Sequence, residues 1–395
     1  MTGNSQQRHA DAAARWKSIA RRGAVLSLLT LCAACQTILP RGGQAPVTGA
    51  APEPVIVPAD GKHHVALLLP ISGPDGDVGR AIANATAIAL IDTANTSITL
   101  QTYDTALDVQ GAARRAIADG NKLILGPLRS DDVVSVADIA QTKNVPIISF
   151  SNDISVAGRN AFLLGHLPDQ SIARTVNFAK ARNLTRFGAI VSSNVYGQRA
   201  AANFTRAVRD AGGVLVSVQE VDGSAASVDA ATRRVQAAGT IDAVMVADTG
   251  KSALAIIPSI RSHGMKNAQI LGTDLWNIDG SLASSPVMRG AWFSSVADGY
   301  FRTFATKYRA KYGKPPLRLA SLGYDAILLT MRVAPKWKLG TSFPIAQLID
   351  RGGFVGIDGA FRFNASGLSE RMLEVQEIQK GKFVTIDAAP TAFAP

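Results

Sequence analysis

The chain has 395 residues, with 41 basic and 30 acidic side chains, a formal net charge of +11 and 47% hydrophobic residues. This composition excludes a disordered or low-complexity chain, and the length favours more than one domain because single cores stop growing near about 250–300 residues. With two cysteines, Cys32 and Cys35, and five histidines without metal-ligand spacing, the sequence argues against a disulfide scaffold, a cysteine-ligated zinc site and a catalytic centre built on His or Cys.

Residues 1–34 have the pattern of a bacterial signal peptide. A basic stretch precedes a short apolar run over residues 24–31, and small residues follow that run. The run is too short for a membrane-spanning helix, which needs about 20 apolar residues, and it fits the apolar core of an export signal. We therefore expect residues 1–34 to be removed from the mature protein. The basic stretch consists of Arg15, Lys17, Arg21 and Arg22.

Cys35 stands in a sequence that resembles the lipobox of bacterial lipoproteins. Ala33 and Ala34 precede it, and in that family the cysteine is lipidated and begins the mature chain. The resemblance implies a periplasmic protein that touches the membrane through its lipid anchor only, and Gln36 favours the outer over the inner membrane. Plain secretion stays an alternative, because Cys32 stands where the lipobox usually has leucine. Cys32 and Cys35 also have the spacing of a redox Cys-x-x-Cys motif. That motif needs a strand-to-helix setting, which an apolar export segment does not provide.

Residues 35–61 comprise the lipidated cysteine and a tether. The segment is rich in Pro, Gly and Ala and nearly uncharged, which predicts a semi-rigid, extended spacer. Removal of residues 1–34 takes away five basic side chains and one acid, so the net charge falls from +11 to +7. The basic residues of the body are dispersed, without aromatic interleaving, so we expect no nucleic acid partner.

From residue 65 onward, short unbroken apolar runs alternate with helical patterns of about 12–18 residues. Unbroken runs indicate strands buried on both faces, as in a parallel sheet covered by helices. The pattern predicts an α/β fold with two doubly wound parallel-sheet lobes of about four strands each. The expected strands are Val65–Leu69, Ile98–Tyr103, Leu123–Leu125, Pro146–Phe150, Ala189–Val191, Val214–Val218, Ala243–Ala247 and Gln269–Leu271.

The order of elements changes after residue 292. Two long helical patterns, near 300–312 and 319–333, precede a glycine-rich β segment over 354–363 and strands around 373–378 and 383–386. We expect the two lobes to share these late elements. The predicted division assigns residues 62–165 plus 295–350 to the first lobe and residues 166–294 plus 351–390 to the second.

Polar side chains gather in the loops that follow the predicted strands, where open α/β sheets bind ligands. Hydroxyls and helix N-termini can hold a carboxylate, a side-chain carboxylate can hold an ammonium group, and an aromatic ring can cover an aliphatic part. This composition suits a small amino-acid-like ligand, although each such side chain can also be a helix N-cap. The candidate ligand-binding residues are Ser72, Arg129, Ser130, Ser151, Asn152, Tyr196, Thr249, Asp274 and Trp276.

Two enzyme-like motifs carry less weight. Residues 73–79 have the glycine spacing of a dinucleotide fingerprint, but the segment contains two acids that would repel a pyrophosphate. Residues 250–252 resemble the end of a phosphate-binding loop, but Met245 stands where its first glycine is required. The sequence also contains neither Gly-x-Ser-x-Gly nor His-Glu-x-x-His. We therefore expect that the protein is not an enzyme and that it has no catalytic residue, bound metal or cofactor.

Over residues 63–385 the sequence resembles the type I periplasmic binding proteins of the leucine/isoleucine/valine-binding class. The resemblance depends on several short motifs that occur in the same order along the chain. These motifs are His64-Val-Ala-Leu-Leu-Leu-Pro-Ile-Ser-Gly-Pro74, Tyr103-Asp-Thr105, Gly126-Pro-Leu-Arg-Ser130, Val145-Pro-Ile-Ile-Ser149, Tyr196-Gly197, and Gly356-Ile-Asp-Gly-Ala-Phe-Arg-Phe-Asn364 with Gly367 after it.

The resemblance implies two lobes joined by a three-strand hinge that close on an amino acid. By position, Ser130 and Ser151 match the residues that hold the ligand carboxylate, Tyr196 the aromatic cover, and Asp274 the acid that holds the ammonium group. It also implies a non-catalytic receptor that delivers its ligand to the permease of an ABC importer, as in amino acid transport.

A branch with the same fold offers a second interpretation. The penicillin-binding-protein activators are outer-membrane lipoproteins that stimulate a peptidoglycan synthase by protein contact. The lipobox, the tether and the stretch Ile148-Ser-Phe-Ser-Asn-Asp153 also resemble that branch. The two interpretations are nearly equal, with a slight preference for the receptor because the fold itself supports it.

Overall fold

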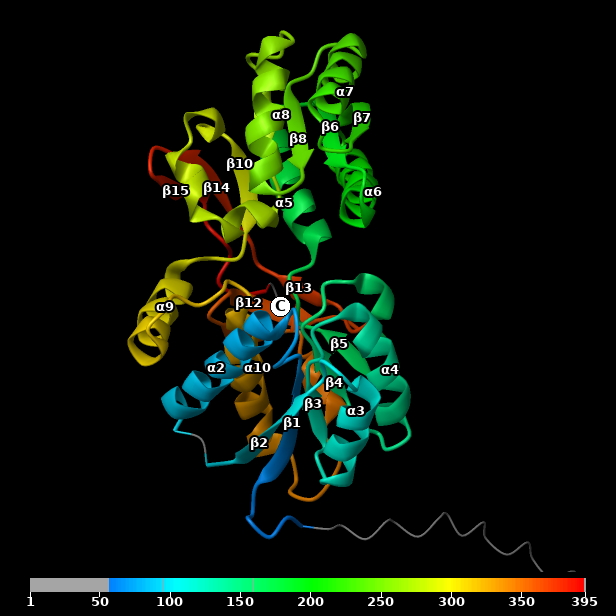
Figure 1. The fold of residues 1–395 in the computed structure, drawn as a ribbon, viewed down its shortest axis with the longest axis vertical. Coiled ribbons are helices and arrows are strands. Elements are labelled where there is room, and N and C mark those ends of the chain that lie inside the picture. The colour runs from blue at the N-terminus through cyan, green and yellow to red at the C-terminus, as the bar shows by residue number, and fades with distance from the viewer. Residues whose placement is uncertain (1–56, 95, 159, 394–395) are drawn as a thin grey trace, which may run out of the picture. The chain divides into compact units, whose positions relative to one another are not determined.

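The computed structural model describes residues 57–94, 96–158 and 160–393 (Figure 1). The expected signal peptide, Cys35 and most of the tether lie outside these residues. Within the described part of the chain, every helix is too short or too polar to cross a membrane.

The first lobe contains a parallel sheet with the strand order β2-β1-β3-β4-β5. The order is typical of a doubly wound α/β fold. Four of its strands match predicted apolar runs, and the short β5 was missed. The strands are β1 (His63–Leu69), β2 (Ile98–Asp104), β3 (Leu123–Leu125), β4 (Ile147–Ser149) and β5 (Ala161–Leu163).

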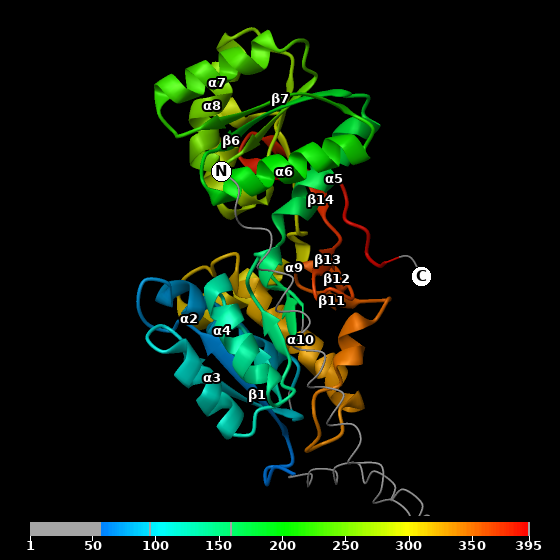
Figure 2. The ribbon, with the colours of Figure 1, turned by 90° about the vertical axis from the view of Figure 1, so that its right-hand side faces the viewer.

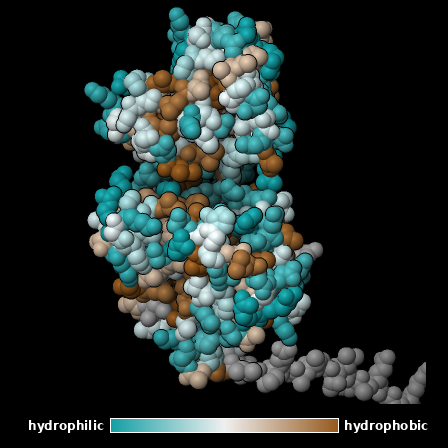
Figure 3. Space-filling model, in the orientation of Figure 1, coloured by the Kyte–Doolittle hydropathy of each residue, from teal (hydrophilic) through white to brown (hydrophobic). Residues whose placement is uncertain are grey.

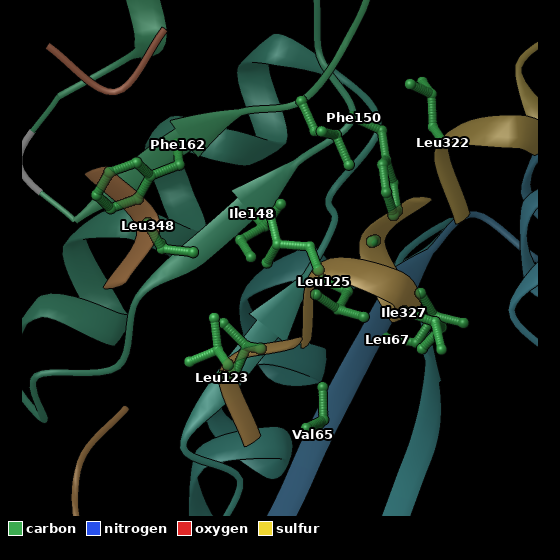
Figure 4. Close-up of a cluster of buried hydrophobic side chains, with 14 of the residues drawn as sticks. Val65, Leu67, Leu123, Leu125, Ile148, Phe150, Phe162, Leu322, Ile327 and Leu348 are labelled. Atoms are coloured by element: carbon green, nitrogen blue, oxygen red, sulfur yellow. The ribbon is translucent and has the colours of Figure 1, made fainter. Parts of the chain in front are cut away.

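Strand β1 shows why an unbroken apolar run predicts a doubly covered sheet. Val65, Leu67 and Leu69 pack in one core with helices on one face, whereas Ala66 and Leu68 pack in another core on the opposite face. Figure 4 shows part of the first core, in which strand side chains meet residues of α10. The helices are α2 (Gly76–Asp92) and α10 (Ala320–Val333) on that face, α3 (Val109–Ala118) and α4 (Ser130–Gln141) on the other, and α9 (Gly299–Tyr312) against α2.

The second lobe contains a sheet with the strand order β15-β14-β10-β9-β8-β6-β7. Strands β6 to β10 are parallel, and the last two strands of the chain extend the sheet through antiparallel pairs, β10 with β14 and β14 with β15. The strands are β6 (Arg186–Ser192), β7 (Val214–Val221), β8 (Ala243–Ala247), β9 (Gln269–Leu271), β10 (Trp292–Ser295), β14 (Glu374–Gln379) and β15 (Lys382–Asp387).

Two helices cover each face of this second sheet. The predicted helical face of Ile172, Val176 and Ala179 is confirmed, since all three residues lie in the core with α6. The helices are α5 (Pro168–Ala181) and α6 (Val195–Asp210) on one face, and α7 (Ala225–Ala237) and α8 (Gly250–Ser262) on the other. The predicted fold class, two parallel-sheet α/β lobes, is confirmed.

A small antiparallel sheet departs from the predicted lobe boundaries. It consists of β11 (Phe354–Gly356), β12 (Gly359–Phe363) and β13 (Ser369–Arg371). Its aromatic residues Phe354, Phe361 and Phe363 are buried in the core of the first lobe, and β11 contacts α10, beside which it lies in Figure 2. The prediction placed residues 351–390 together in the second lobe. Only β14 and β15 join that lobe's sheet, because the apolar face of the small sheet is covered by the first lobe.

The chain passes between the two lobes three times: after β5, after β10 and after β13. The first crossing is packed closely against the loop after β4, since a Cβ atom at Gly165 would lie 2.3 Å from the backbone oxygen of Ser151. The three crossings therefore hold the loops of the first sheet next to the start of the second lobe.

Candidate functional site

A cavity of about 260 Å³ lies where residues of both lobes and of the three crossings meet. Figure 3 shows a hollow between the lobes, with apolar side chains along its borders. The polar residues that line the cavity include Ser151, Asn152, Asp274, Arg318 and Arg371. Its apolar walls include Leu128, Phe150, Leu167, Leu275, Leu319 and Leu373.

The loops after β4 and β9 bring side chains of the two lobes to this cavity, at the carboxyl ends of parallel strands. Ser151 and Asn152 follow β4, where the Ser149 hydroxyl accepts a hydrogen bond from the Ser151 N–H at 3.0 Å. Asp274 begins a 3₁₀ turn after β9, and its N–H donates to the Ser171 Oγ at 2.9 Å. Ser171 and Gln170, from the first turns of α5, also line the cavity.

Asp274 is the acidic group of the cavity wall. Its Oδ1 atom is enclosed and has no hydrogen-bond partner among the described residues. Burial raises the pKa of this carboxyl to about 7, and the charge of Asp169 adds to the effect. Near neutral pH the carboxyl therefore exists in both protonation states, and an incoming ammonium group would favour the ionised one.

Two arginines face the same cavity. Arg318 precedes α10, and its Nη1 lies 2.5 Å from the Oδ1 of Asp358. Arg371 ends β13, and its Nη2 donates to the Leu164 carbonyl at 2.7 Å. Their side chains are only 8% and 2% exposed. Both guanidinium groups are thus fixed by contacts on one side and enclosed by protein.

Asp358 joins Arg318 to the first crossing. Its Oδ2 accepts from the Ser321 hydroxyl at 2.7 Å and lies 2.8 Å from the Nε2 of His166, which also lines the cavity. Burial by itself would raise the pKa of Asp358, but Arg318 and His166 outweigh it and hold the pKa well below its usual range. Burial raises the pKa of the neighbouring Asp325 to about 7, assisted by the charge of Asp358.

Three of the nine predicted ligand-binding residues line the cavity, namely Ser151, Asn152 and Asp274. The structure places the other six elsewhere. Three of those are engaged at helix starts or in nearby loops. The Ser72 hydroxyl donates to the Asp104 Oδ2 at 2.7 Å, Arg129 Nη1 lies 3.5 Å from the Asp75 Oδ2, and Ser130 is the first residue of α4.

The remaining three residues make their contacts within the second lobe. Thr249 caps α8 by accepting from the Ser252 N–H at 3.2 Å. The hydroxyl of Tyr196 donates to the Thr273 Oγ1 at 2.9 Å. Trp276 is completely buried and donates its indole N–H to the Asp248 carbonyl at 3.1 Å. These contacts satisfy the polar groups within the lobe and leave none of the three side chains on the cavity wall.

Sequence reasoning missed His166, Arg318 and Arg371. They lie at crossings or element ends, so no strand-loop pattern marks them. Arg371 ends β13, in which residues 369 and 371 are buried and residue 370 is not. Charged side chains are seldom fully buried unless they are paired or used. Among the described residues, no group of three or more His, Cys, Asp or Glu side chains could hold a metal ion.

Comparison with known proteins gives a partial sequence match. An uncharacterised protein of Rickettsia prowazekii is 30% identical over 116 residues, which cover 29% of this chain and 31% of that protein. The match thus spans about a third of the relative's length.

Solved structures match over most of the chain at identities that show the fold. A Rhodospirillum rubrum protein assigned to a branched-chain amino acid ABC transporter has a TM-score of 0.72 at 19% identity, covering 82% of this chain and 100% of its own. A leucine-binding protein of Thermotoga maritima has a TM-score of 0.60 at 20% identity, covering 84% and 99%. A Rhodopseudomonas palustris ABC-transporter solute-binding protein, in complex with 3,4-dihydroxybenzoic acid, has a TM-score of 0.64 at 18% identity. The match covers 85% of this chain and 98% of that protein.

The family model named "Periplasmic binding protein" matches residues 62–367, most of the chain. Members of this family are non-catalytic receptors of the periplasm. The chain therefore belongs to the periplasmic binding proteins, and its fold is that of the type I, leucine-binding class that the sequence motifs predicted.

Proposed function

We propose that the protein is the solute receptor of an ABC importer and binds a small amino-acid-like ligand in the cavity between the lobes. The observation that carries the proposal is the enclosed, unpartnered Oδ1 of Asp274 in the wall of a cavity that is also lined by apolar side chains. A buried polar atom without a partner costs free energy, and a bound ligand that donates a hydrogen bond would recover it.

The chemistry of the walls supports an amino-acid-like ligand. The Asp274 carboxylate would hold the ammonium group, the loop of Ser151 and Asn152 offers donors to the carboxylate, and Leu128, Phe150 and other apolar residues would enclose the side chain. The volume of about 260 Å³ lies just below the range for drug-sized small-molecule sites, about 300–1,000 Å³. The size thus favours a single amino acid over a peptide.

The proposed location is the periplasmic face of a membrane, with the mature chain lipid-anchored at Cys35. The support is the sequence pattern of residues 1–61, and Gln36 favours the outer membrane. A lipid-anchored chain should incorporate radiolabelled fatty acid in cells, and the Cys35→Ala variant should not. A wild-type chain that stays unlabelled and soluble in the periplasm would instead indicate plain secretion.

The second candidate is a penicillin-binding-protein activator. The lipobox and the tether favour it, but contact with a synthase needs no cavity that contains an unpartnered buried carboxylate oxygen. The activator interpretation predicts that the purified protein is retained on an immobilised peptidoglycan synthase and accelerates glycan polymerisation. Retention and acceleration, together with no ligand binding, would favour the activator over the receptor.

A ligand screen tests the receptor proposal. Purified residues 36–395 would be melted alone and with each member of a panel of amino acids, dipeptides and aromatic acids. At a ligand concentration of 100 Kd, the expected stabilisation is about 2.7 kcal/mol. No stabilisation by any compound at millimolar concentration would contradict the proposal. Tyr300→Ala, on the exposed side of α9, is a control that should melt and respond like the wild type.

We expect ligand affinity to depend on pH through Asp274. Its folded pKa is raised to about 7 by burial and by Asp169. An ammonium group binds the ionised carboxylate, so affinity should increase by up to about tenfold per pH unit below 7 and level off above it. In the ligand-free protein the sign is reversed: the contribution of Asp274 to stability is complete below about pH 4 and is lost as the pH rises through about 7.

Titration calorimetry would measure the ligand affinity of the wild type and of Asp274→Asn over a range of pH. The ratio of the two affinities isolates the pH dependence that Asp274 causes. The ratio is needed because His166, Asp169 and Asp325 also surround or support the cavity. Their effects appear in both proteins and cancel in the ratio. We expect a ratio near one at pH 5 that increases to at least tenfold at pH 8. A ratio that stays constant over this range would show that Asp274 does not bind the ammonium group.

A further inference from the structure

We propose that Arg318 and Arg371 form an anion subsite at one wall of the cavity, so that the ligand is bound through a carboxylate by two buried guanidinium groups. This inference rests on the proposed receptor function and specifies its ligand class. It assigns the dominant carboxylate contact to two residues outside the strand-end loops.

The first support is the cost of the two buried cations. Arg318 precedes α10 in the first lobe, and Arg371 lies at the third crossing. Both line the cavity, with side chains 8% and 2% exposed. A buried charge is strongly unfavourable unless paired and hydrogen-bonded. Their partial pairing in the ligand-free protein is thus consistent with a binding role.

The second support is the set of N–H groups that remain unpartnered. Among the described residues, the Nε and Nη2 of Arg318 and the Nε and Nη1 of Arg371 are buried without a hydrogen-bond partner. In Arg318 these two nitrogens lie along one edge of the guanidinium, and their N–H bonds match the two oxygens of a carboxylate. Each arginine therefore offers donors that its protein partners do not use.

The third support is that both guanidinium groups are held in place. Arg318 is bonded to Asp358, and its Cζ lies 4.0 Å from the centre of the Phe301 ring. Arg371 is bonded to the Leu164 carbonyl, and its Cζ lies 5.0 Å from the centre of the Phe361 ring. A binding group that is already oriented loses little entropy when the ligand arrives.

The nearby carboxylates leave this wall able to attract an anion. Asp358 is occupied by Arg318, His166 and Ser321. Asp298 lies 3.6 Å from Arg318, and Asp325 lies 3.8 Å from Arg371, both beyond good hydrogen-bond distance. The pKa of Asp325 is raised to about 7 by burial and by Asp358, so its carboxyl only partly neutralises Arg371.

The carboxylate can come from two parts of an amino acid: the α-carboxylate or an acidic side chain. Acid and amide pairs distinguish them. Leucine and leucinamide differ at the α-carboxylate, whereas glutamate and glutamine differ at the side chain. The dissociation constant of each compound would be measured by titration calorimetry with residues 36–395, for the wild type, for Arg371→Gln and for the control Arg362→Gln. Arg362 lies on neighbouring β12 and pairs with Glu370 at 2.8 Å.

We expect the amide of the preferred ligand to bind the wild type at least tenfold more weakly than the acid. Arg371→Gln should weaken the acid at least tenfold and leave the amide nearly unchanged, and Arg362→Gln should alter neither. If leucinamide binds the wild type more weakly than leucine does, the subsite binds the α-carboxylate. If glutamine binds more weakly than glutamate does, the subsite binds the side-chain carboxylate. If Arg371→Gln does not fold, Arg371→Lys keeps the charge without the planar guanidinium and should still weaken binding of the acid selectively.

Two results separate the possible failures. If no compound of the panel binds the wild type, the receptor proposal itself fails. If a compound binds and loses affinity in Asp274→Asn, but acid and amide bind the wild type equally or respond equally to the Arg371 variant, the receptor proposal stands and the anion subsite is wrong.

Discussion

Replacing Asp358 by asparagine is expected to lower the free energy of unfolding by about 3 kcal/mol or more. The carboxylate is completely buried, and it contacts the side chains of Arg318, His166 and Ser321. An amide keeps the shape but removes the charge, so the Arg318 cation stays buried without its closest partner. Urea-induced unfolding of the ligand-free protein at pH 7 measures this loss.

The choice of pH 7 for that experiment follows from the lowered pKa of Asp358. The folded pKa of Asp358 lies well below its usual range, because Arg318 and His166 outweigh the effect of burial. Its contribution to stability is therefore complete above about pH 4 and is lost only in stronger acid. Glu370→Gln, which removes the partly exposed ion pair with Arg362, is the matched control and should cost about 1 kcal/mol or less. Equal losses in the two variants would contradict the assigned role of Asp358.

Trp276→Ala is expected to destabilise the second lobe by about 3–5 kcal/mol. The indole is completely buried in the core with Phe293, 6.2 Å away between ring centres, and its N–H bonds to the Asp248 carbonyl. Removing it leaves a cavity in the core and an unsatisfied carbonyl, and thermal unfolding monitored by circular dichroism would show the loss.

The same variant tests the sequence-based assignment of Trp276 as a ligand contact. In the structure the indole does not line the cavity, so at temperatures where the variant is folded its ligand affinity should match the wild type within about twofold. Tyr300→Ala removes an aromatic ring that is 64% exposed and should change stability by about 0.5 kcal/mol or less. Normal stability with lost binding in Trp276→Ala would restore the original assignment.

The sequence predicted the two-lobe fold because buried parallel strands leave a direct trace. Residues Val65 to Leu69 are an unbroken apolar run, and all five are inaccessible to solvent in the structure. The small sheet was assigned to the wrong lobe for a physical reason. The apolar residues of a strand such as Gly359–Phe363 show that it is partly buried, but they do not show which core covers it.

The site was predictable only in part. Strand-end loops are recognisable, and three of the ligand-binding residues predicted from them, Ser151, Asn152 and Asp274, line the cavity. The same loops contain helix caps of identical composition, such as Thr249, and composition cannot separate a cap from a ligand contact. Arg318 and Arg371 reach the cavity through tertiary packing of segments distant in sequence, which no local pattern encodes.

The most direct test of the receptor function is titration calorimetry of residues 36–395 with the compound that stabilises them most in the screen, beside the Asp274→Asn variant at pH 8. We predict one molecule bound per chain and a dissociation constant at least tenfold larger in the variant. Binding that is unchanged in Asp274→Asn and in Arg371→Gln would place the ligand outside this cavity, and absence of any binding compound would contradict the receptor function.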